Sequence, residues 1–472
     1  MGEWSRRRFL QAGAAASAAA ALAACSDSKN PSTASGSDTA SGSDTAGNPA
    51  PPAAKGKLTD VEHVVIFIQE NRSFDQYFGT RQRVRGFDDP KVPKGASGKP
   101  AWYQPSPENP DGFVLPFRFD SLTTSGQCAA DIDHSWEGQH TAWNGGKNDG
   151  FAQHMGVNAL GYFTAQDLPY YGALADRYTV CDGYHCSVLG PTNPNRLFAF
   201  TGNIDAGGQH EGPIIDNTTK PFTWETYAER LQRAGVSWRV YHEADDFDDN
   251  TIKFFKSFLD LKPTDDLYVN ALQNRTVADF AADVARGELP QVSWLVAPTA
   301  LSEHPPFAPA AGQNLTAQYL AAVFANPKVW AKTVFIYTTD ENGGYFDHVP
   351  PPVPDRGTKE EFVRDVPIGL GFRVPTLVVS PWSADGKVVS DVFDHTSALQ
   401  FLEKRFGVEV PYVSAWRRRT VGDLTTTLDF ATFDASVPKL PDAAAWATKV
   451  AATCSTLPPA TPPAKQVKPK QG

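Results

Sequence analysis

The feature that most constrains this chain is a set of short apolar runs, rich in valine, isoleucine and aromatic residues, that have the length of β-strands. They are Val64–Ile68, Val236–Tyr241, Val292–Ala297, Val334–Thr338 and Val374–Val379. Because the runs do not alternate between apolar and polar residues, we expect both faces of each strand to be buried. Strands of this kind belong to a sheet that is covered on both sides.

Helical patterns with recognisable ends lie between these runs. They are Thr223–Ala234, Thr276–Arg286, Leu315–Ala325 and Thr396–Phe406. A glycine follows three of them, and Asn326 with Pro327 follows the other, as is typical of helix ends. Buried strands that alternate with helices predict an α/β fold of three layers, in which a largely parallel central sheet carries helices on both faces.

Polar side chains follow the strands at the points where the strands end. Glu70 and Asn71 follow the first run, His242 the second, His304 the third, and Asp340 with Glu341 the fourth. Ligands of such sheets bind beyond the carboxyl ends of the strands, so we expect these residues at one edge. Carboxylate and amide oxygens suit Mg²⁺, Ca²⁺ or Mn²⁺, and Zn²⁺ also accepts them. One acidic pair alone is more often a solvated strand end, but two pairs at equivalent positions favour a single shared divalent cation.

The segment Leu189–Phe200, which reads LGPTNPNRLFAF, contains a candidate nucleophile. Asn193 suits a helix cap and Pro194 the first helical position, so Thr192 is predicted to lie just ahead of a helix. Free N–H groups and the helix dipole favour phosphate at such a place, and a hydroxyl there can attack phosphorus when a metal lowers its pKa. The alternative is that Thr192 only caps a turn. Arg196 could likewise clamp phosphate or form a structural ion pair.

Several of the ten histidines lie beside other polar residues, namely His134, His304, His348 and His395. Each of them alone is more often a hydrogen-bonded structural histidine. A phosphoester site, however, needs donors for the nonbridging oxygens and an acid for the leaving group. Imidazole provides both near neutral pH.

The first 25 residues have the pattern of an export signal. Ser5–Leu10 contains consecutive arginines typical of the twin-arginine route, and the small apolar run Ala12–Ala24 is too short to span a bilayer permanently. Leu22–Cys25 has the form of a lipobox, in which a lipid is attached to the cysteine; the alternative is a cleaved signal with an incidental Cys25. We therefore expect an exported lipoprotein on the outer face of the cell membrane or cell wall, with a secreted form as the alternative.

Two segments are predicted to be disordered. Residues 26–57 are rich in Ser, Thr, Gly, Ala, Pro and Asp and suit a flexible tether, and residues 458–472 form a tail rich in Pro and Lys. Residues 58–457 are left as one catalytic domain.

The net charge of −10 offers no general attraction to nucleic acid or to an anionic lipid surface. Membrane contact is therefore expected through the lipid anchor, while the oligomeric state stays open.

Apart from Cys25, the chain has four cysteines: Cys128, Cys181, Cys186 and Cys454. An even number in an oxidising compartment allows two disulfides, with three possible pairings. A zinc site is less expected, because the spacing lacks the close CxxC pairs of zinc ribbons.

Six segments occur in an order that resembles the signature blocks of the bacterial phosphoesterase family. They are Val61–Thr80, Asp133–Phe151, Cys181–Asp205, Gln291–Phe307, Thr338–Pro352 and Gly369–Gly407. That family includes phospholipases C and some acid phosphatases, and the chain most resembles the short actinobacterial phospholipases C with twin-arginine signals. The resemblance implies an alkaline-phosphatase-like fold with a single active site.

The resemblance also implies roles for individual residues. Metal ligands would be Glu70, Asn71, Asp340, Glu341 and Thr192, with Thr192 also the nucleophile, and His134, His242 and His304 would surround the phosphoryl group. The implied activity is hydrolysis of phosphatidylcholine-type lipids to diacylglycerol and a phosphorylated head group. Acid phosphatase activity on phosphomonoesters is the alternative, and an inactive, lipid-anchored binding protein is an alternative of another class. The last is disfavoured because all of these ligand positions are retained.

Overall fold

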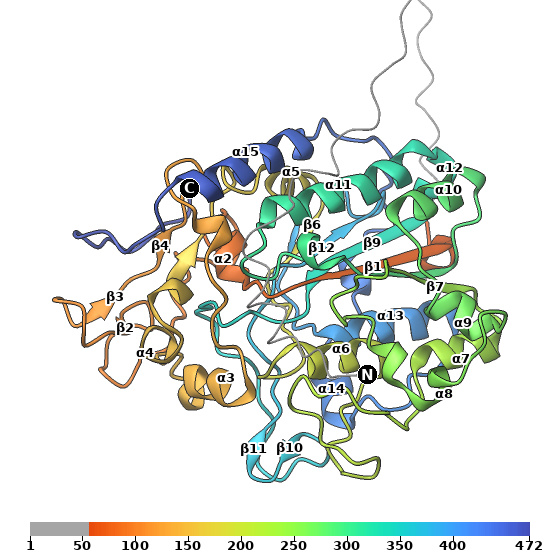
Figure 1. Cartoon of the computed structure of the whole chain (residues 1–472), viewed down its shortest axis with the longest axis horizontal. Coiled ribbons are helices and arrows are strands. Elements are labelled where there is room, and N and C mark those ends of the chain that lie inside the picture. Colours follow the sequence, from red (N-terminus) through yellow and green to blue (C-terminus); the bar gives the residue numbers. More distant parts are fainter. Residues whose placement is uncertain (1–55) are drawn as a thin grey trace, which may run out of the picture. The chain divides into compact units, whose positions relative to one another are not determined.

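A seven-stranded sheet runs through residues 56–472, the part of the chain that the computed structural model describes (Figure 1). In spatial order its strands are β13 (Val388–Val389), β6 (Thr179–Cys181), β12 (Leu377–Val379), β9 (Thr333–Thr339), β1 (His63–Gln69), β8 (Val292–Leu295) and β7 (Trp238–Tyr241). Pairing is parallel except for β12, which is antiparallel to β9 and β6. The twin-arginine pattern, Cys25 and the tether up to residue 55 lie outside the described residues.

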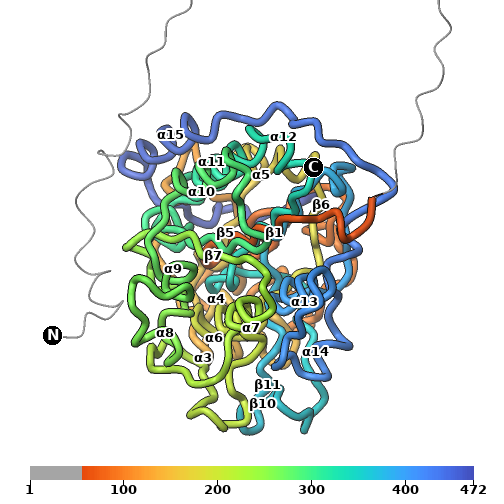
Figure 2. The backbone as a smooth tube through the Cα atoms, turned by 90° about the vertical axis from the view of Figure 1, so that its right-hand side faces the viewer, coloured from red at the N-terminus to blue at the C-terminus, as the bar shows by residue number. Residues whose placement is uncertain are grey.

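Helices cover both faces of this sheet (Figures 1 and 2). One face carries α5 (Pro169–Arg177), α10 (Val277–Arg286), α11 (Pro309–Ala325), α12 (Pro327–Trp330) and α15 (Ala443–Thr456). The other carries α6 (Thr192–Thr201), α7 (Tyr227–Ala234), α8 (Lys256–Leu259), α13 (His395–Phe406) and α14 (Ala415–Thr420), with α9 (Asp266–Ala271) beside β7. The predicted three-layer α/β architecture with a largely parallel sheet is confirmed.

The side chains of β1 show why helices must cover both faces of the sheet. Val65 and Phe67 belong to one hydrophobic core, where the ring of Phe67 lies 5.4 Å from that of Tyr319 on α11. Val64 belongs to the second core together with Leu197 of α6. Successive strand residues point to opposite faces, so an apolar run without alternation fills both cores at once.

The predicted strands and helices are present, with shifted ends. The sequence missed β6 and β13, which have only three and two residues and so show no usable pattern. It also placed the start of α11 too late, because that helix begins at Pro309, a residue that suits a first helical turn.

A long excursion lies beyond the carboxyl end of β1, at the left of Figure 1. It follows α2 (Phe74–Phe78) and contains α3 (Trp136–Trp143), α4 (Phe151–Met155) and the short strands β2 (Gln104–Pro105), β3 (Phe113–Val114), β4 (Phe117–Arg118) and β5 (Gly161–Tyr162). A separate hairpin, β10 (Phe362–Val363) with β11 (Val366–Pro367), leaves the sheet region between β9 and β12. The excursion carries His134 to the same end of the sheet as the predicted carboxylates.

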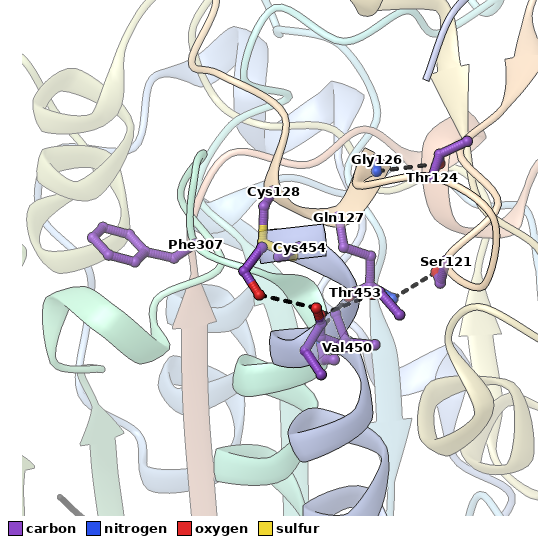
Figure 3. The surroundings of a disulfide bond; sticks show 12 residues. Ser121, Thr124, Gly126, Gln127, Cys128, Phe307, Val450, Thr453 and Cys454 are labelled. Atoms are coloured by element: carbon purple, nitrogen blue, oxygen red, sulfur yellow. Dashed lines mark hydrogen bonds between the residues drawn. A yellow bond between two sulfur atoms is a disulfide. The ribbon is translucent and has the colours of Figure 1, made fainter. Parts of the chain in front are cut away.

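One disulfide, Cys128–Cys454, joins the excursion to α15 (Figure 3). Beside it, Gln127 donates to Ser121 Oγ at 2.8 Å and accepts from the N–H of Ala310 in α11 at 2.9 Å. The other two cysteines, at positions 181 and 186, are buried free thiols. The number of cysteines allowed two disulfides, and the structure contains one of them. The number of cysteines does not determine which side chains meet.

The C-terminal segment differs from the disorder that its composition predicted. Residues 458–472 contain no helix or strand, yet they bind the excursion. Gln466 Oε1 accepts from the N–H of Leu115, and Gln471 Oε1 from that of Asp88, each at 2.8 Å. Glutamine side chains thus satisfy backbone groups of distant loops, which composition cannot reveal.

No helix within residues 56–472 has the length and apolar character needed to cross a membrane.

Candidate active site

The two predicted acidic pairs lie side by side at the carboxyl ends of neighbouring strands. Glu70 and Asn71 follow β1 directly, and Asp340 and Glu341 follow β9, whose residues pair with β1 in parallel up to the last position. All four side chains are fully buried. The N–H of Asn71 donates to Asp340 Oδ1 at 3.2 Å. Parallel pairing thus brings together residues that are 269 positions apart.

The backbone at this edge adopts a left-handed turn. Asn71 has φ 55°, a conformation that asparagine tolerates better than most residues. Gly343 has φ 62°, and a Cβ atom at that position would lie 2.4 Å from the carbonyl oxygen of Asn71. The loops that follow β1 and β9 can therefore pack this closely only with glycine at position 343.

Thr192 is the first residue of α6, not the residue ahead of it, and the N-cap is Pro191. The predicted cap was wrong because Asn193 lies inside the first turn of α6. Its backbone N–H donates to Asn217 Oδ1 at 2.9 Å and its Nδ2 donates to Thr218 O at 3.4 Å, while its Oδ1, the atom that would cap, has no partner among the described residues. Asn195 Oδ1 accepts from the backbone of Ser187 and the next residue. The helix therefore begins two residues earlier, and the Thr192 side chain belongs to its first turn.

Arg196 lies one turn after Thr192 and binds three buried carboxylates. Its guanidinium lies 2.7 Å from Glu70, 3.1 Å from Asp249 and 3.3 Å from Asp340, and each of these side chains is at most 1% exposed. Of the two roles considered for Arg196, the structure shows the ion pair. Asp249 was not predicted, because it stands in a stretch of several aspartates after β7 and nothing in the sequence distinguishes it from the others.

More carboxyl groups are buried at this site than its one guanidinium can pair with when they are ionised. Burial raises the pKa of Glu70 well above its ordinary value, and Asp249 and Asp340 raise it further, while Arg196 opposes them. Burial also raises the pKa of Glu341 to about 8, an effect that His134 partly offsets. One guanidinium does not balance this set of carboxylates, and buried charge of one sign requires a counter-charge.

Unpaired oxygen atoms test whether a cation fits here. Four of the predicted ligand residues each have a buried side-chain oxygen with no hydrogen-bond partner among residues 56–472: Glu70 Oε2, Asn71 Oδ1, Thr192 Oγ and Glu341 Oε1. Buried polar atoms in native proteins almost always have partners. An all-oxygen set of carboxylates, an amide and a hydroxyl suits a hard divalent cation. The residues therefore fit the predicted metal.

One imidazole, that of His134, lies beside this oxygen set, and a second, that of His304, lies beside His134. His134 Nε2 lies 3.8 Å from Glu341 Oε1 and 3.5 Å from Asn71 Nδ2. The rings of His134 and His304 are edge to face, with centroids 5.7 Å apart, and ligand atoms of Asp131 and both histidines lie within 4.8 Å of one another. Burial opposes protonation of His134, but Glu341 and then Asp131 outweigh it and raise its pKa. His134 therefore holds a proton more firmly than a free imidazole, beside the carboxyl group of Glu341.

The remaining candidate histidines are placed differently. His242 follows β7 as predicted. Its Nδ1 contacts Glu243 O and Asp246 within its own loop, and its Nε2 is buried with no hydrogen-bond partner among the described residues. His395 Nε2 donates to the carbonyl oxygen of Asp340 at 2.6 Å and so supports a ligand loop. His348 has a structural role of another kind, in an ion cluster.

That ion cluster ties together the loops that follow β1 and β9. Asp75 follows the Glu70 loop and Asp347 follows the Asp340 loop, and Arg373 binds both carboxylates at 2.8–3.0 Å. His348 Nδ1 donates to Asp75 at 2.6 Å. Arg373 and His348 thus form ion pairs within the cluster, and His348 Nε2 also lies 3.3 Å from Asp89.

Comparison with known proteins gives the class to which this site belongs. A model of the phosphoesterase family matches residues 61–409. This chain belongs to the phosphoesterase family. The family resemblance seen in the sequence blocks is thereby confirmed.

Named relatives of this phosphoesterase include phospholipases C. It is 43% identical to the non-hemolytic phospholipase C of Pseudomonas aeruginosa, over 88% of this chain and 64% of that protein. It is 44% identical to phospholipase C B of Mycobacterium tuberculosis, over 80% of this chain and 79% of that one. The chain thus spans less than two thirds of the Pseudomonas relative. Among solved structures, a protein in the alkaline phosphatase superfamily from Vibrio parahaemolyticus aligns with 66% of this chain and 75% of its own, at 13% identity and a TM-score of 0.31.

Proposed function

We propose that this phosphoesterase is a phospholipase C that cleaves phosphatidylcholine-type lipids into diacylglycerol and a phosphorylated head group. The observation that carries the proposal is the Thr192 hydroxyl: it is buried, has no hydrogen-bond partner among the described residues, and lies one helical turn from the arginine that binds the strand-end carboxylates. A hydroxyl in this position suits a nucleophile. The names of relatives from two bacterial genera support the choice of phospholipase C.

Glu70, Asn71, Asp340, Glu341 and Thr192 would hold one divalent cation. When bound, that cation would lower the pKa of the Thr192 hydroxyl and offset charge on the phosphoryl oxygens. The residues of the chain supply the rest. Arg196 keeps Glu70 and Asp340 in place, and the ion cluster below the site keeps the two ligand loops together.

The proposed reaction consists of two in-line displacements. Thr192 Oγ loses its proton to solvent and forms a bond to phosphorus, while the bond from phosphorus to the diacylglycerol oxygen breaks. An imidazole, His304 or His134, gives its proton to the departing oxygen. In the second step a water molecule attacks phosphorus and gives a proton back to that imidazole. The bond between Thr192 Oγ and phosphorus breaks, Thr192 Oγ takes a proton back from solvent, and the phosphorylated head group leaves.

Product analysis tests the proposal. Purified protein with added divalent cation is incubated with phosphatidylcholine vesicles, and the water-soluble phosphorus is identified. Phosphocholine together with diacylglycerol supports a phospholipase C. Release of inorganic phosphate from simple monoesters, without cleavage of phosphatidylcholine, would instead identify an acid phosphatase. Absence of both products across a panel of divalent cations would favour a binding protein.

The site of action in the cell is a separate part of the proposal. The twin-arginine pattern and Cys25 support export by the twin-arginine route and a lipid anchor on the outer face of the cell membrane. Replacing Arg6 and Arg7 with lysine should retain the protein in the cytoplasm. Cys25→Ala should release it into the medium and abolish labelling with a fatty-acid analogue. Unchanged labelling of Cys25→Ala would contradict the anchor.

A further inference from the structure

Glu303, the residue before His304, has a carboxyl group buried in the protein interior, where an ionised group loses its hydration. It is 0% exposed and lies between β8 and α11. Its backbone is left-handed, with φ 71°, which a glutamate rarely adopts. Gly312 of α11 leaves the space for it, because a Cβ atom there would lie 2.1 Å from Glu303 Cγ. Strained and buried polar residues of this kind persist where the surroundings hold them firmly.

Tyrosine hydroxyls surround the Glu303 carboxylate. Tyr77 of α2 and Tyr171 of α5 each donate a short hydrogen bond, one to each carboxylate oxygen. Tyr337 of β9 donates at 3.3 Å, and Gln69 Nε2 of β1 at 3.4 Å. Burial raises the pKa of Glu303 to about 7, and the tyrosine hydroxyls oppose that rise. Side chains from four elements of the fold thus converge on Glu303. We call the three tyrosines, Tyr77, Tyr171 and Tyr337, the tyrosine cage.

The backbone of Glu303 is held as firmly as its side chain. Arg72 donates from Nε to the Glu303 carbonyl oxygen at 2.9 Å and from Nη2 to the same oxygen, and it reaches the Phe307 carbonyl at 3.2 Å. Gln69 and Arg72, which bind Glu303, stand on either side of the ligand pair Glu70 and Asn71 in the sequence. The same contacts therefore connect the loop after β8 to the proposed metal-ligand loop.

The next residue along this loop is His304. Its N–H donates to Ser302 Oγ at 3.2 Å, and its Nδ1 donates to the carbonyl oxygen of Pro305 at 2.6 Å. The first bond fixes the backbone next to residue 303, and the second fixes the ring relative to that backbone, so the direction of the ring depends on the backbone of residue 303. The ring meets His134 edge to face, at 5.7 Å between centroids. Since Nδ1 is bonded to the carbonyl oxygen of Pro305, Nε2 lies on the side of the ring away from that bond.

We propose that Glu303 is a positioning residue for His304: the tyrosine cage and Arg72 hold it in a left-handed turn that aims the imidazole of His304 at the phosphoryl group. The inference rests on the proposed function, in which His304 acts on that group. Glu303 itself does not contact the substrate.

A double-mutant cycle tests this role. Turnover of p-nitrophenyl phosphocholine is measured for the full-length protein and for the variants Glu303→Gln, His304→Asn and the double variant. We expect Glu303→Gln to lower kcat by roughly 10- to 100-fold with KM nearly unchanged, since it removes alignment and not binding. In the His304→Asn background the same change should cost less than about threefold, because the residue it acts through is gone.

A matched control separates positioning from stability. Asp283 of α10 is also a buried carboxylate that accepts a tyrosine hydroxyl, at 2.7 Å from Tyr241, and it lies outside the proposed machinery. Asp283→Asn should lower the denaturation midpoint and leave kcat near the wild-type value. If Glu303→Gln does not fold, Tyr171→Phe keeps the carboxylate, removes one donor, and should show the same dependence on His304.

Two results would overturn the inference. One is a fall in kcat for Glu303→Gln that is as large in the His304→Asn background as in the wild type. The other is a loss of Mn²⁺ affinity in Glu303→Gln large enough to explain the lost turnover, which would place the effect in the ligand loop. Failure of the proposed function looks different, because the wild-type protein itself would then release no p-nitrophenol with any divalent cation.

Discussion

Replacing Thr192 with valine separates chemistry from folding more cleanly than other changes at this site. Thr192 is fully buried, and its hydroxyl has no hydrogen-bond partner among residues 56–472. Valine has nearly the same shape and is compatible with the first turn of α6. An unsatisfied buried polar group costs about 1–3 kcal/mol, and a buried methyl group contributes about 0.8 kcal/mol. The metal-free variant should therefore unfold at the same urea concentration as the wild type or at a higher one.

Activity should change in the opposite direction. Without the Oγ atom no bond from residue 192 to phosphorus can form, so kcat should fall at least about 10⁴-fold, equivalent to about 5.5 kcal/mol of transition-state stabilisation. The assay is release of phosphocholine from phosphatidylcholine vesicles, with urea unfolding followed by tryptophan fluorescence on the same preparations. Thr192→Ser keeps the hydroxyl and should retain most of the turnover.

Thr201, at the other end of α6, provides the control. Its buried hydroxyl donates to Leu197 O at 2.8 Å and accepts from Trp224 Nε1 at 3.1 Å. Thr201→Val should lower the free energy of unfolding by about 1–3 kcal/mol and leave kcat unchanged. Near-normal turnover by Thr192→Val would refute its assignment as the nucleophile. A marked loss of stability in the metal-free variant would refute the reading of its hydroxyl as unpartnered.

Three further predictions concern the charges around this site. A chelator should abolish phosphocholine release, and a divalent cation at 100 times its dissociation constant should both restore activity and stabilise the fold by about 2.7 kcal/mol in calorimetry; activity that survives complete removal of metal would contradict the site. Arg196→Met leaves three carboxylates without their counter-charge and should cost about 3–5 kcal/mol in urea unfolding, against less than about 1 kcal/mol if the ion pairs were solvated. Glu303 has a pKa of about 7 in the folded protein against an ordinary 4.5, so its contribution to stability is fully present below about pH 4.5 and is lost as pH rises through 7. The difference in unfolding free energy between wild type and Glu303→Gln should accordingly shrink by about 3 kcal/mol between pH 4.5 and 8, and a pH-independent difference would show that Glu303 does not titrate in this range.

The meeting of the two acidic pairs could be predicted from the chain because parallel strands end at the same edge of the sheet. Once the apolar runs were recognised as buried strands of one parallel sheet, the residues that follow them had to lie at its carboxyl end. Glu70 with Asn71 and Asp340 with Glu341 meet for this reason. The same argument brought His304 to that edge, where its ring meets His134 from the excursion. His242 also follows its strand as expected, with Nδ1 bonded within its own loop and Nε2 buried without a partner among the described residues.

Residues whose roles depend on a distant partner could not be found in this way. Arg196 had two possible roles until Glu70, Asp249 and Asp340 were seen around its guanidinium. Asp249 was indistinguishable from its aspartate neighbours. The start of α6 was misjudged because Asn193 and its neighbours bind other loops, and cap propensity considers only the local chain.

The sequence by itself determined the class of fold, the family and the place of the strand-end acidic pairs. These follow from local patterns, from chain direction and from motifs in a set order. Tertiary structure alone decided that Cys128 pairs with Cys454, that the segment after residue 458 binds the excursion, and that Glu303 lies within a cage of tyrosines from three separate elements. The physical reason is the same in each case. A hydrogen bond, ion pair or disulfide depends on where two side chains meet in space, and burial gives it its strength.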